Sequence, residues 1–241
     1  SHCEKLGVPV IEDAAHSLGT TWRGKNIGTF GRLGCFSFQS YKLLNSGEGG
    51  MLITDDPDCF AKAVVMSGAY EHNWKKHHGE RQFFEKWQNQ LPLYNMRLNN
   101  LSALIVDSQI PYLDERIENG RRNHDIAAKK LSHSEWIHVP EKFEHEARAP
   151  DSIQFNLVGL TPLEVSQFCD LINRMGVALQ VFGNSKDNAR AFWNWDFLPE
   201  RFNLPKTRGM LMNACDVRLP ARLNVDAVSY THLRAHETTP H

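Results

Sequence analysis

Three short apolar segments near the start of the chain constrain its fold more than any other feature. Residues 8–11, 35–38 and 51–54 are rich in β-branched or aromatic side chains, and turn-forming residues bound each of them. Such runs are typical of strands that are buried on both faces. Asp56-Pro57 then opens a helix predicted over residues 57–66. Short buried strands joined by longer connections predict an α/β layer architecture.

Composition excludes several functional classes. Lys plus Arg (27) nearly balances Asp plus Glu (28), so the chain has no basic field that would attract a nucleic acid. Its longest apolar runs are well short of the ~20 residues that a membrane-spanning helix needs. The five cysteines are widely spaced and form no C-x-x-C pair. We therefore expect no metal site, no nucleic-acid partner, no membrane attachment and a reducing, cytoplasmic location.

The later segments predict a second, smaller α+β unit. Residues 99–131 have an approximate helical stripe of apolar side chains, and Pro111 should kink that helix. Residues 152–182 read as strand, helix and strand, with a capping box at Thr161-Pro162-Leu163-Glu164. Residues 68–94 have no clear period, so we predict a long surface loop there, either functional or merely variable.

Two charged residues flank the first strands. Asp13 follows the first apolar segment, where a carboxylate needs a cationic partner or hydrogen-bond donors; it could equally cap a helix that begins after it. Lys42 lies between the aromatic segment and the turn Gly47-Glu48-Gly49-Gly50. It is either a solvated charge or, if desolvated, a nucleophile able to form a Schiff base. The glycine turn alone is weak evidence for a phosphate site, because no Walker pattern is present.

The motifs acquire meaning from their order and spacing. The chain reads V-I-E-D-A-A-H over residues 10–16, F-S-F-Q-S-Y-K over 36–42 and G-E-G-G over 47–50. Together they resemble the DegT/DnrJ/EryC1/StrS family of aminotransferases, which depend on pyridoxal 5′-phosphate (PLP). The segment N-M-R-L-N-N-L-S-A over residues 95–103 is similar to a fourth family motif. The resemblance extends over residues 1–228.

This resemblance implies a PLP-dependent transferase of fold type I, like aspartate aminotransferase. Residues 1–110 would form the C-terminal part of a large domain with a mainly parallel sheet, and residues 111–228 a smaller α+β domain. Family members have a further portion of the large domain before this region, so we expect a longer natural protein and an inactive isolated chain. Residues 229–241 resemble a translated sequencing adapter, and we expect them to be non-native.

The resemblance also assigns a role to each motif residue. Asp13 would pair with the protonated pyridine nitrogen of PLP. His16 would lie against the ring or near its 3′-oxygen, unless it is only a polar residue at a helix start. Ser37 would donate its hydroxyl to the phosphate, and Lys42 would bind PLP as a Schiff base and then transfer protons. Asn95 would reach the phosphate of PLP in the neighbouring subunit, which implies a homodimer with shared active sites.

The implied function is transfer of an amino group, typically from glutamate, to a keto-sugar nucleotide in cell-surface polysaccharide or secondary-metabolite biosynthesis. A dehydratase branch of the family has His in place of the Schiff-base lysine, so Lys42 favours transamination. A non-catalytic PLP-binding sensor or regulator is the alternative within the family. A simple nucleotide-binding α/β domain is the alternative outside it, and would leave the spacing of Asp13 and Lys42 unexplained. Residues 68–94 and 180–195 are candidate contacts to the amino acceptor.

Overall fold

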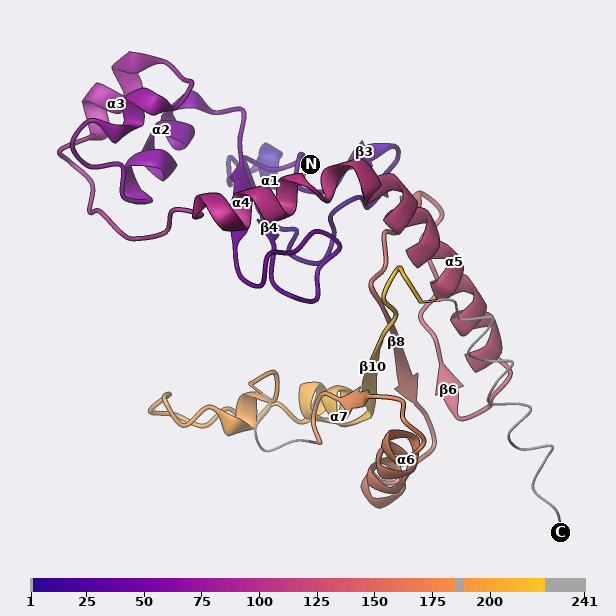
Figure 1. Cartoon of the computed structure of the whole chain (residues 1–241). Helices are drawn as coiled ribbons and strands as arrows, with labels where there is room; N and C mark the ends of the chain where they lie inside the picture. Colours follow the sequence, from indigo (N-terminus) through magenta and orange to yellow (C-terminus); the bar gives the residue numbers. More distant parts are fainter. Residues whose placement is uncertain (1, 185–188, 224–241) are drawn as a thin grey trace, which may run out of the picture. The chain divides into compact units, whose positions relative to one another are not determined.

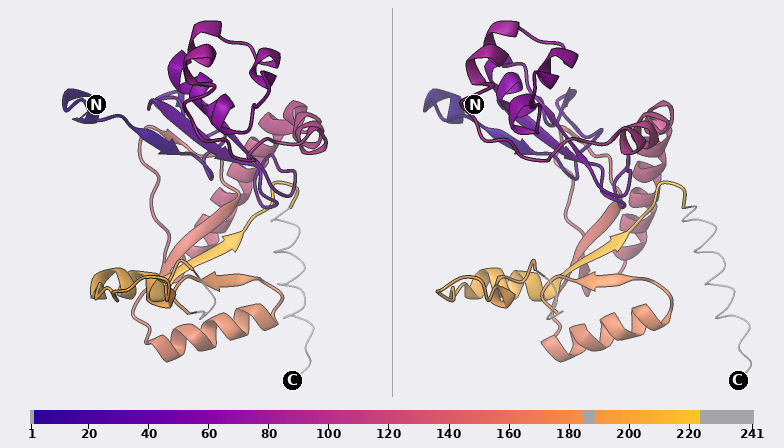
Figure 2. Two further views of the ribbon diagram at one scale, coloured as in Figure 1. Left: turned by 90° about the vertical axis from the view of Figure 1, so that its left-hand side faces the viewer. Right: turned by 60° about the vertical axis from the view of Figure 1, so that its left-hand side comes forward.

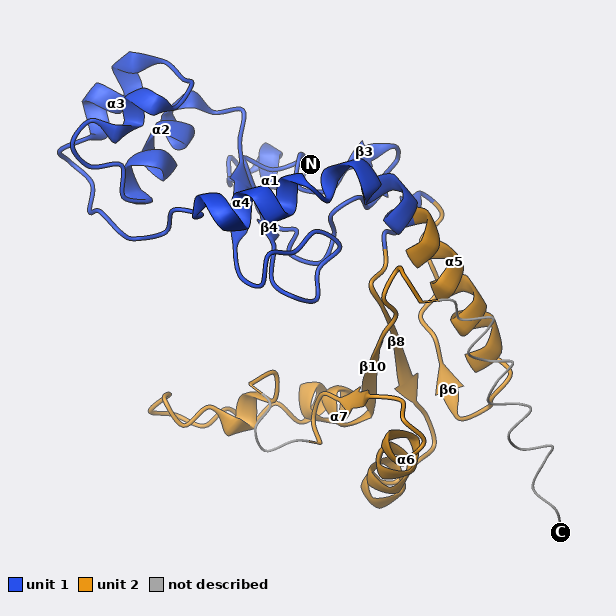
Figure 3. Cartoon of the chain, viewed as in Figure 1, with its two compact units in different colours: residues 1–117, 145–149 blue, residues 118–144, 150–241 orange. Residues whose placement is uncertain are grey.

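The computed structural model of the chain describes residues 2–184 and 189–223, which form two compact units. Unit 1 consists of residues 1–117 and 145–149, and unit 2 of residues 118–144 and those from 150 onward (Figure 3). The domain division expected after residue 110 stays a prediction. The segment 229–241, expected to be non-native, lies outside the described residues.

Unit 1 contains a sheet of three strands in the order β1-β4-β5. Its central strand, β4, is labelled in Figure 1. The central strand β4 (Leu33–Ser37) pairs in parallel with β1 (Ile11–Asp13) and antiparallel with β5 (Gly50–Ile53). The strand predicted over residues 8–11 is therefore wrong in position, because β1 begins where that segment ends. Pro9 has no N–H to donate to a ladder, and only residues 11–13 pair with β4.

A short helix and a small second sheet complete the first part of unit 1. Helix α1 (His2–Lys5) precedes β1. Strands β2 (Thr21–Trp22) and β3 (Lys25–Asn26) form a hairpin, and β2 also pairs antiparallel with β7 (Glu146–Ala147). The two loop residues of the hairpin, Arg23 and Gly24, have φ angles of 50° and 76°. Positive φ at both positions is the conformation that lets a two-residue loop follow the twist of its strands.

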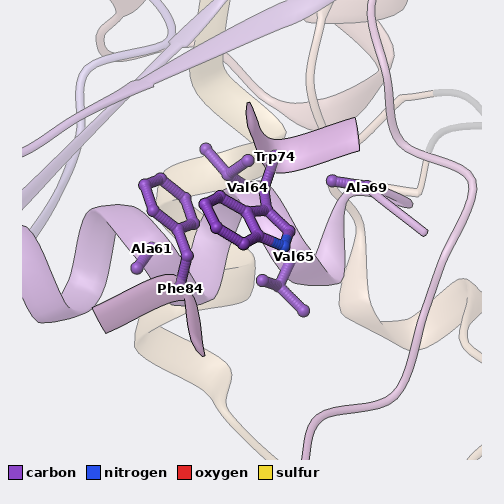
Figure 4. Close-up of a cluster of buried hydrophobic side chains, with 6 residues drawn as sticks. All are labelled: Ala61, Val64, Val65, Ala69, Trp74 and Phe84. Carbon is purple, nitrogen blue, oxygen red and sulfur yellow. The ribbon is translucent and has the colours of Figure 1, made fainter. Parts of the chain in front are cut away.

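Helix α2 (Pro57–Met66) has the predicted bounds, and the Asp56 side chain caps its first turn. The prediction of an irregular loop over residues 68–94 is wrong. This segment contains a 3-10 helix, η1 (Asn73–Lys76), and helix α3 (Arg81–Trp87). Their aromatic side chains pack onto α2 in a buried cluster (Figure 4), whose members are Ala61, Val64, Val65, Ala69, Trp74 and Phe84. Elements this short contain too few turns to show a helical period in the sequence.

The predicted long helix is divided at Pro111. Helix α4 (Asn100–Asp107) is followed by the 3-10 helix η2 (Ile110–Tyr112), which contains Pro111, and then by α5 (Leu113–Leu131). The interruption confirms the predicted effect of Pro111, which has no N–H for a helical hydrogen bond. Residues 113–117 of α5 belong to unit 1 and the rest to unit 2.

Unit 2 is built on an antiparallel sheet in the order β6-β8-β10-β9. The predicted strand–helix–strand is confirmed as β8 (Ser152–Leu157), α6 (Pro162–Arg174) and β9 (Leu179–Val181), and the capping box joins Thr161 and Glu164. Helix α6 lies along one face of the sheet (Figure 2) and buries the apolar side chains of β8 and β9. The remaining elements are β6 (Ile137–His138), η3 (Phe192–Asn194), α7 (Pro205–Asn213) and β10 (Ala214–Arg218).

Among the helices in the described part of the chain, none is both long enough and apolar enough to cross a lipid bilayer.

Candidate active site

Asp13 and Ser37 lie at the same edge and on the same face of the parallel pair formed by β1 and β4. Asp13 is paired in register with Cys35, and Ser37 follows Cys35 by two residues, the period of side chains on one face of a strand. Because the strands are parallel, both residues are at carboxyl ends. The sheet therefore brings together a carboxylate and a hydroxyl that are separated by 24 positions in sequence (37 − 13).

The alternative interpretation of Asp13 as a helix N-cap is wrong, because turns and not a helix follow it. The Asp13 Oδ1 atom accepts a hydrogen bond of 3.1 Å from the N–H of Ala15. His16 lies in the same turn segment and is exposed, so it is not at a helix start either. The carboxylate of Asp13 is itself exposed and could accept a further donor from a ligand.

Lys42 lies in the connection between β4 and β5. Beyond the sheet, the N–H of Phe38 donates to the Gly49 carbonyl (2.8 Å) and that of Ser40 to the Gly47 carbonyl (2.9 Å), so the two strands continue as a hairpin. Gly47 and Gly49 have φ angles of 86° and 148°. These angles disfavour any side chain with a Cβ, which explains the first two glycines of the G-E-G-G motif by backbone geometry. Lys42 is thus held a few residues beyond Ser37.

Side chains that the sequence did not single out fix the Lys42 connection. The Gln109 Nε2 atom donates to the Asn45 carbonyl (2.6 Å), and an Arg116 Nη atom donates to the Leu43 carbonyl (2.6 Å). Asn45 in turn donates from Nδ2 to the Lys42 carbonyl at 3.1 Å. Buried Leu44 packs in an apolar cluster with Phe38 and Val106. Gln109 and Arg116 are more than 60 residues away from the carbonyls that they bind, so no local motif could reveal them.

Asn95 lies in an extended segment that is hydrogen-bonded to the end of α2. The N–H groups on either side of it, those of Tyr94 and Met96, donate to the carbonyls of Met66 (2.8 Å) and Ser67 (3.0 Å). The guanidinium of Arg97 lies 5.4 Å from the centre of the Tyr70 ring. Asn95 is therefore held by its neighbours' backbone while its own side chain is exposed.

Glu12 is the site residue that sequence reasoning missed. Its Oε1 atom accepts the N–H groups of Phe30 and Gly31 (2.6 Å each), and its Oε2 atom accepts that of Gly28 (2.8 Å). Burial raises the pKa of the Glu12 carboxyl, but the three N–H donors and nearby Lys25 outweigh it, so the pKa is lowered overall. The sequence does contain a signal for it: Glu12 is an acidic residue next to Asp13 in a strand, so its side chain must lie on the opposite face and needs hydrogen-bond donors there.

The side chains at this edge fit PLP by their chemistry. Asp13 offers a carboxylate for a protonated ring nitrogen, Ser37 a hydroxyl for a phosphate, and Lys42 an amine for the aldehyde. Ser37 Oγ accepts the N–H of Gln39 (3.3 Å), which leaves its own O–H able to donate. Within residues 2–184 and 189–223, no cluster of His, Cys, Asp and Glu side chains could hold a metal ion.

Comparison with known proteins decides the family. The model of the DegT/DnrJ/EryC1/StrS aminotransferase family matches residues 1–229. The chain belongs to this family. Its membership confirms the resemblance seen in the motifs, from V-I-E-D-A-A-H to G-E-G-G.

Individual members of the family are similar over most of this chain. A 3-amino-5-hydroxybenzoate synthase of Amycolatopsis mediterranei is 35% identical over 78% of the chain and 47% of its own length. A GDP-perosamine synthase of Vibrio cholerae is 29% identical over 82% of the chain and 48% of its own length. The chain thus spans about half the length of these curated relatives.

A solved structure shows the same fold. The structure of a GDP-4-keto-6-deoxy-D-mannose-3-dehydratase from E. coli, with bound hydrated PLP, matches 95% of this chain and 61% of its own chain. The TM-score is 0.72 at 22% sequence identity. The likeness confirms the predicted fold class, that of the PLP-dependent transferases of fold type I.

Proposed function

We propose that the protein is a PLP-dependent aminotransferase that moves an amino group to a ketone. One observation carries the proposal: Asp13 and Ser37 share a face at the carboxyl edge of β1 and β4, and the connection that follows Ser37 carries Lys42. A carboxylate, a hydroxyl and an amine in this order match the three parts of PLP that a protein must hold. Membership of an aminotransferase family supports the same activity.

Each side chain then has a defined task. When bound, PLP would withdraw electrons from the substrate carbon that carries the amino group. The negative charge of Asp13 would keep a proton on the ring nitrogen, and the Ser37 hydroxyl would orient the phosphate. The Nζ atom of Lys42 would accept the proton from the substrate carbon and deliver it to the C4′ carbon of the cofactor. His16, in the turn after Asp13, would lie against the ring or near its 3′-oxygen.

We propose glutamate as the amino donor and a keto-sugar nucleotide as the acceptor, in cell-surface polysaccharide or secondary-metabolite biosynthesis. The name of the GDP-perosamine synthase from Vibrio cholerae supports a sugar acceptor. The name of the 3-amino-5-hydroxybenzoate synthase instead concerns an aromatic compound. Residues 68–94, in unit 1, remain proposed acceptor contacts; the other candidate segment, 180–195, belongs to unit 2, and its residues 185–188 lie outside the described part of the chain. The five free thiols support a reducing, cytoplasmic setting.

We also propose that the protein acts as a homodimer in which Asn95 completes the partner's phosphate site. Helix α4 begins five residues after Asn95, and several of its apolar side chains are exposed, including Leu101 (69%) and Leu104 (63%). Contiguous apolar surface of this kind marks an interface. Asn95 is also exposed, five residues before the start of α4, so a second copy that covered α4 and the segment before it would reach Asn95.

A spectroscopic titration tests the activity. The whole protein should bind PLP with a visible absorbance band, which Lys42→Ala should abolish, and glutamate should convert that band to the absorbance of the aminated cofactor. Keto-sugar nucleotides would then be screened for restoration of the band, with product masses confirmed by mass spectrometry. A protein without PLP binding contradicts the proposal. PLP binding without any amino transfer favours the non-catalytic sensor instead.

A mixing experiment tests the shared site. Lys42→Ala and Asn95→Ala proteins should each be weak in PLP-dependent transfer. In a mixed dimer, one site combines native Lys42 with the partner's native Asn95, so unfolding and refolding the two variants together should restore activity. Equal mixtures that stay as inactive as either variant contradict the assignment of Asn95.

A further inference from the structure

The face of the β1–β4 pair opposite Asp13 and Ser37 carries a continuous set of contacts around Glu12. Glu12 is paired in register with Gly34, and Phe36 follows Gly34 by two residues on the same face. The segment 28–31 covers this face, because its three N–H groups point at the Glu12 carboxylate. Hydrogen bonds to a carboxylate are stronger than those between neutral groups.

The glycines allow an approach that no side chain would tolerate. A Cβ placed on Gly34 would lie 2.0 Å from the carbonyl oxygen of Gly28, and one placed on Gly28 would lie 2.4 Å from the Phe36 ring. The Gly28 peptide therefore fits directly between Glu12, Gly34 and Phe36. Phe36 is buried and immediately precedes Ser37. One unbroken chain of contacts links the residue before Asp13 to the residue before Ser37.

We propose that Glu12 is a positioning residue. It holds segment 28–31 against the strands β1 and β4, and thereby fixes the distance between the Asp13 and Ser37 side chains that would contact the cofactor. The inference rests on the proposed function for its chemical consequence, but not for its geometry. Glu12 is on the face opposite Asp13 and Ser37, so it would touch neither cofactor nor substrate. It acts through the Gly28 peptide on the two strand ends.

Two measurements on the whole protein test the proposal. The first is the alkylation rate of Cys35 without PLP, because Cys35 lies beside Asp13 and reports the geometry of the edge. The second is the dissociation constant and absorbance spectrum of bound PLP. In Glu12→Gln, one carboxylate oxygen becomes an NH₂ group that cannot accept an N–H. We expect the alkylation rate of Cys35 and the dissociation constant of PLP each to change about tenfold, and the spectrum of bound PLP to change as well.

A matched control separates the positioning effect of Glu12 from a general effect of a Glu→Gln change on stability. Glu164 also accepts a backbone N–H, that of Thr161 at 2.7 Å, but does so in unit 2. Glu164→Gln makes the same chemical change and should leave Cys35 reactivity, PLP affinity and spectrum within about twofold of the wild type. If Glu12→Gln fails to fold, Glu12→Asp replaces it, since a carboxylate shortened by one methylene cannot reach all three N–H groups.

The outcomes are distinguishable. Cys35 reactivity and PLP affinity that both stay within about twofold in the Glu12 variants overturn the proposal, even if the amides of Gly28 and Gly31 exchange faster. A wild-type protein that does not bind PLP refutes the proposed function instead. The positioning role of Glu12 is then tested by Cys35 reactivity alone, with Cys59 on α2 as the internal reference.

Discussion

Asp13 and Cys35 face each other across the parallel strands β1 and β4, with the Cys35 thiol on the face that carries Ser37. Cys35 is partly exposed. A cofactor that contacted both Asp13 and Ser37 would lie next to it, because Cys35 is the register partner of Asp13 and is two residues before Ser37. We therefore predict that PLP slows alkylation of Cys35 at least about fivefold, because a ligand in contact excludes the reagent. Peptide mapping of iodoacetamide-treated protein would measure the rate, and Cys59 should react equally with and without PLP.

Asp13→Asn should separate cofactor binding from catalysis. The amide keeps the size of the side chain but loses the charge that would hold a proton on the ring nitrogen. Removing one preorganised electrostatic partner typically costs about 10²–10³ in rate. We expect PLP to bind and the rate of amino transfer to fall by about that factor in single-turnover measurements. A rate within threefold of the wild type, at about the same PLP occupancy, would remove Asp13 from the mechanism.

Gly34→Ala should destabilise unit 1, because its new Cβ would meet the backbone oxygen of Gly28 at 2.0 Å. Overpacking against backbone costs about 1–3 kcal/mol or more in the free energy of unfolding. Gly209→Ala is the matched control, since Gly209 lies inside helix α7 with no atom within 4 Å of the added Cβ. That change should stabilise by up to about 1 kcal/mol. Denaturant unfolding would give both values, and a neutral Gly34→Ala would contradict the close approach.

Phe84→Ala should unfold the segment 68–94, which lacks a clear period in the sequence. Phe84 is 1% exposed, and its ring stacks on that of Trp74 with centres 5.2 Å apart. Truncating a buried phenylalanine costs about 3–5 kcal/mol. Hydrogen exchange should therefore accelerate across α2 and α3, while Phe197→Ala, at a residue 77% exposed, should leave it unchanged. Unchanged protection in Phe84→Ala would restore the irregular-loop interpretation.

Glu12 should make the protein acid-sensitive. Its folded-state pKa is lowered from 4.5, so its stabilisation is fully present above that value and is lost as the pH falls through the lowered pKa. The difference in unfolding free energy between wild type and Glu12→Gln should be constant near neutral pH and shrink below about pH 4.5. Asp58, whose pKa a hydrogen bond from Lys62 lowers, titrates equally in both proteins and cancels. A difference that does not change with pH would contradict the role of the charge.

Local rules of sequence determined the elements whose signals are short-range. The Thr161–Glu164 capping box and the stop at Pro111 act within one helical turn, so their residues predict the structure directly. The ordered motifs around Asp13, Ser37 and Lys42 likewise predicted the family and the fold class. The helix signals and each of the family motifs consist of residues that are contiguous in the sequence.

Tertiary structure decided what depends on pairing between distant segments. Residues 68–94 have no visible period, yet Trp74 and Phe84 fold them onto α2 by burying aromatic surface. The parallel register of β1 and β4 gave Asp13 and Ser37 a common face and left Glu12 on the other, where three N–H groups bind it. Gln109 and Arg116 hold the Lys42 connection from more than 60 residues away. Such contacts are fixed by burial and register, which a local sequence pattern does not encode.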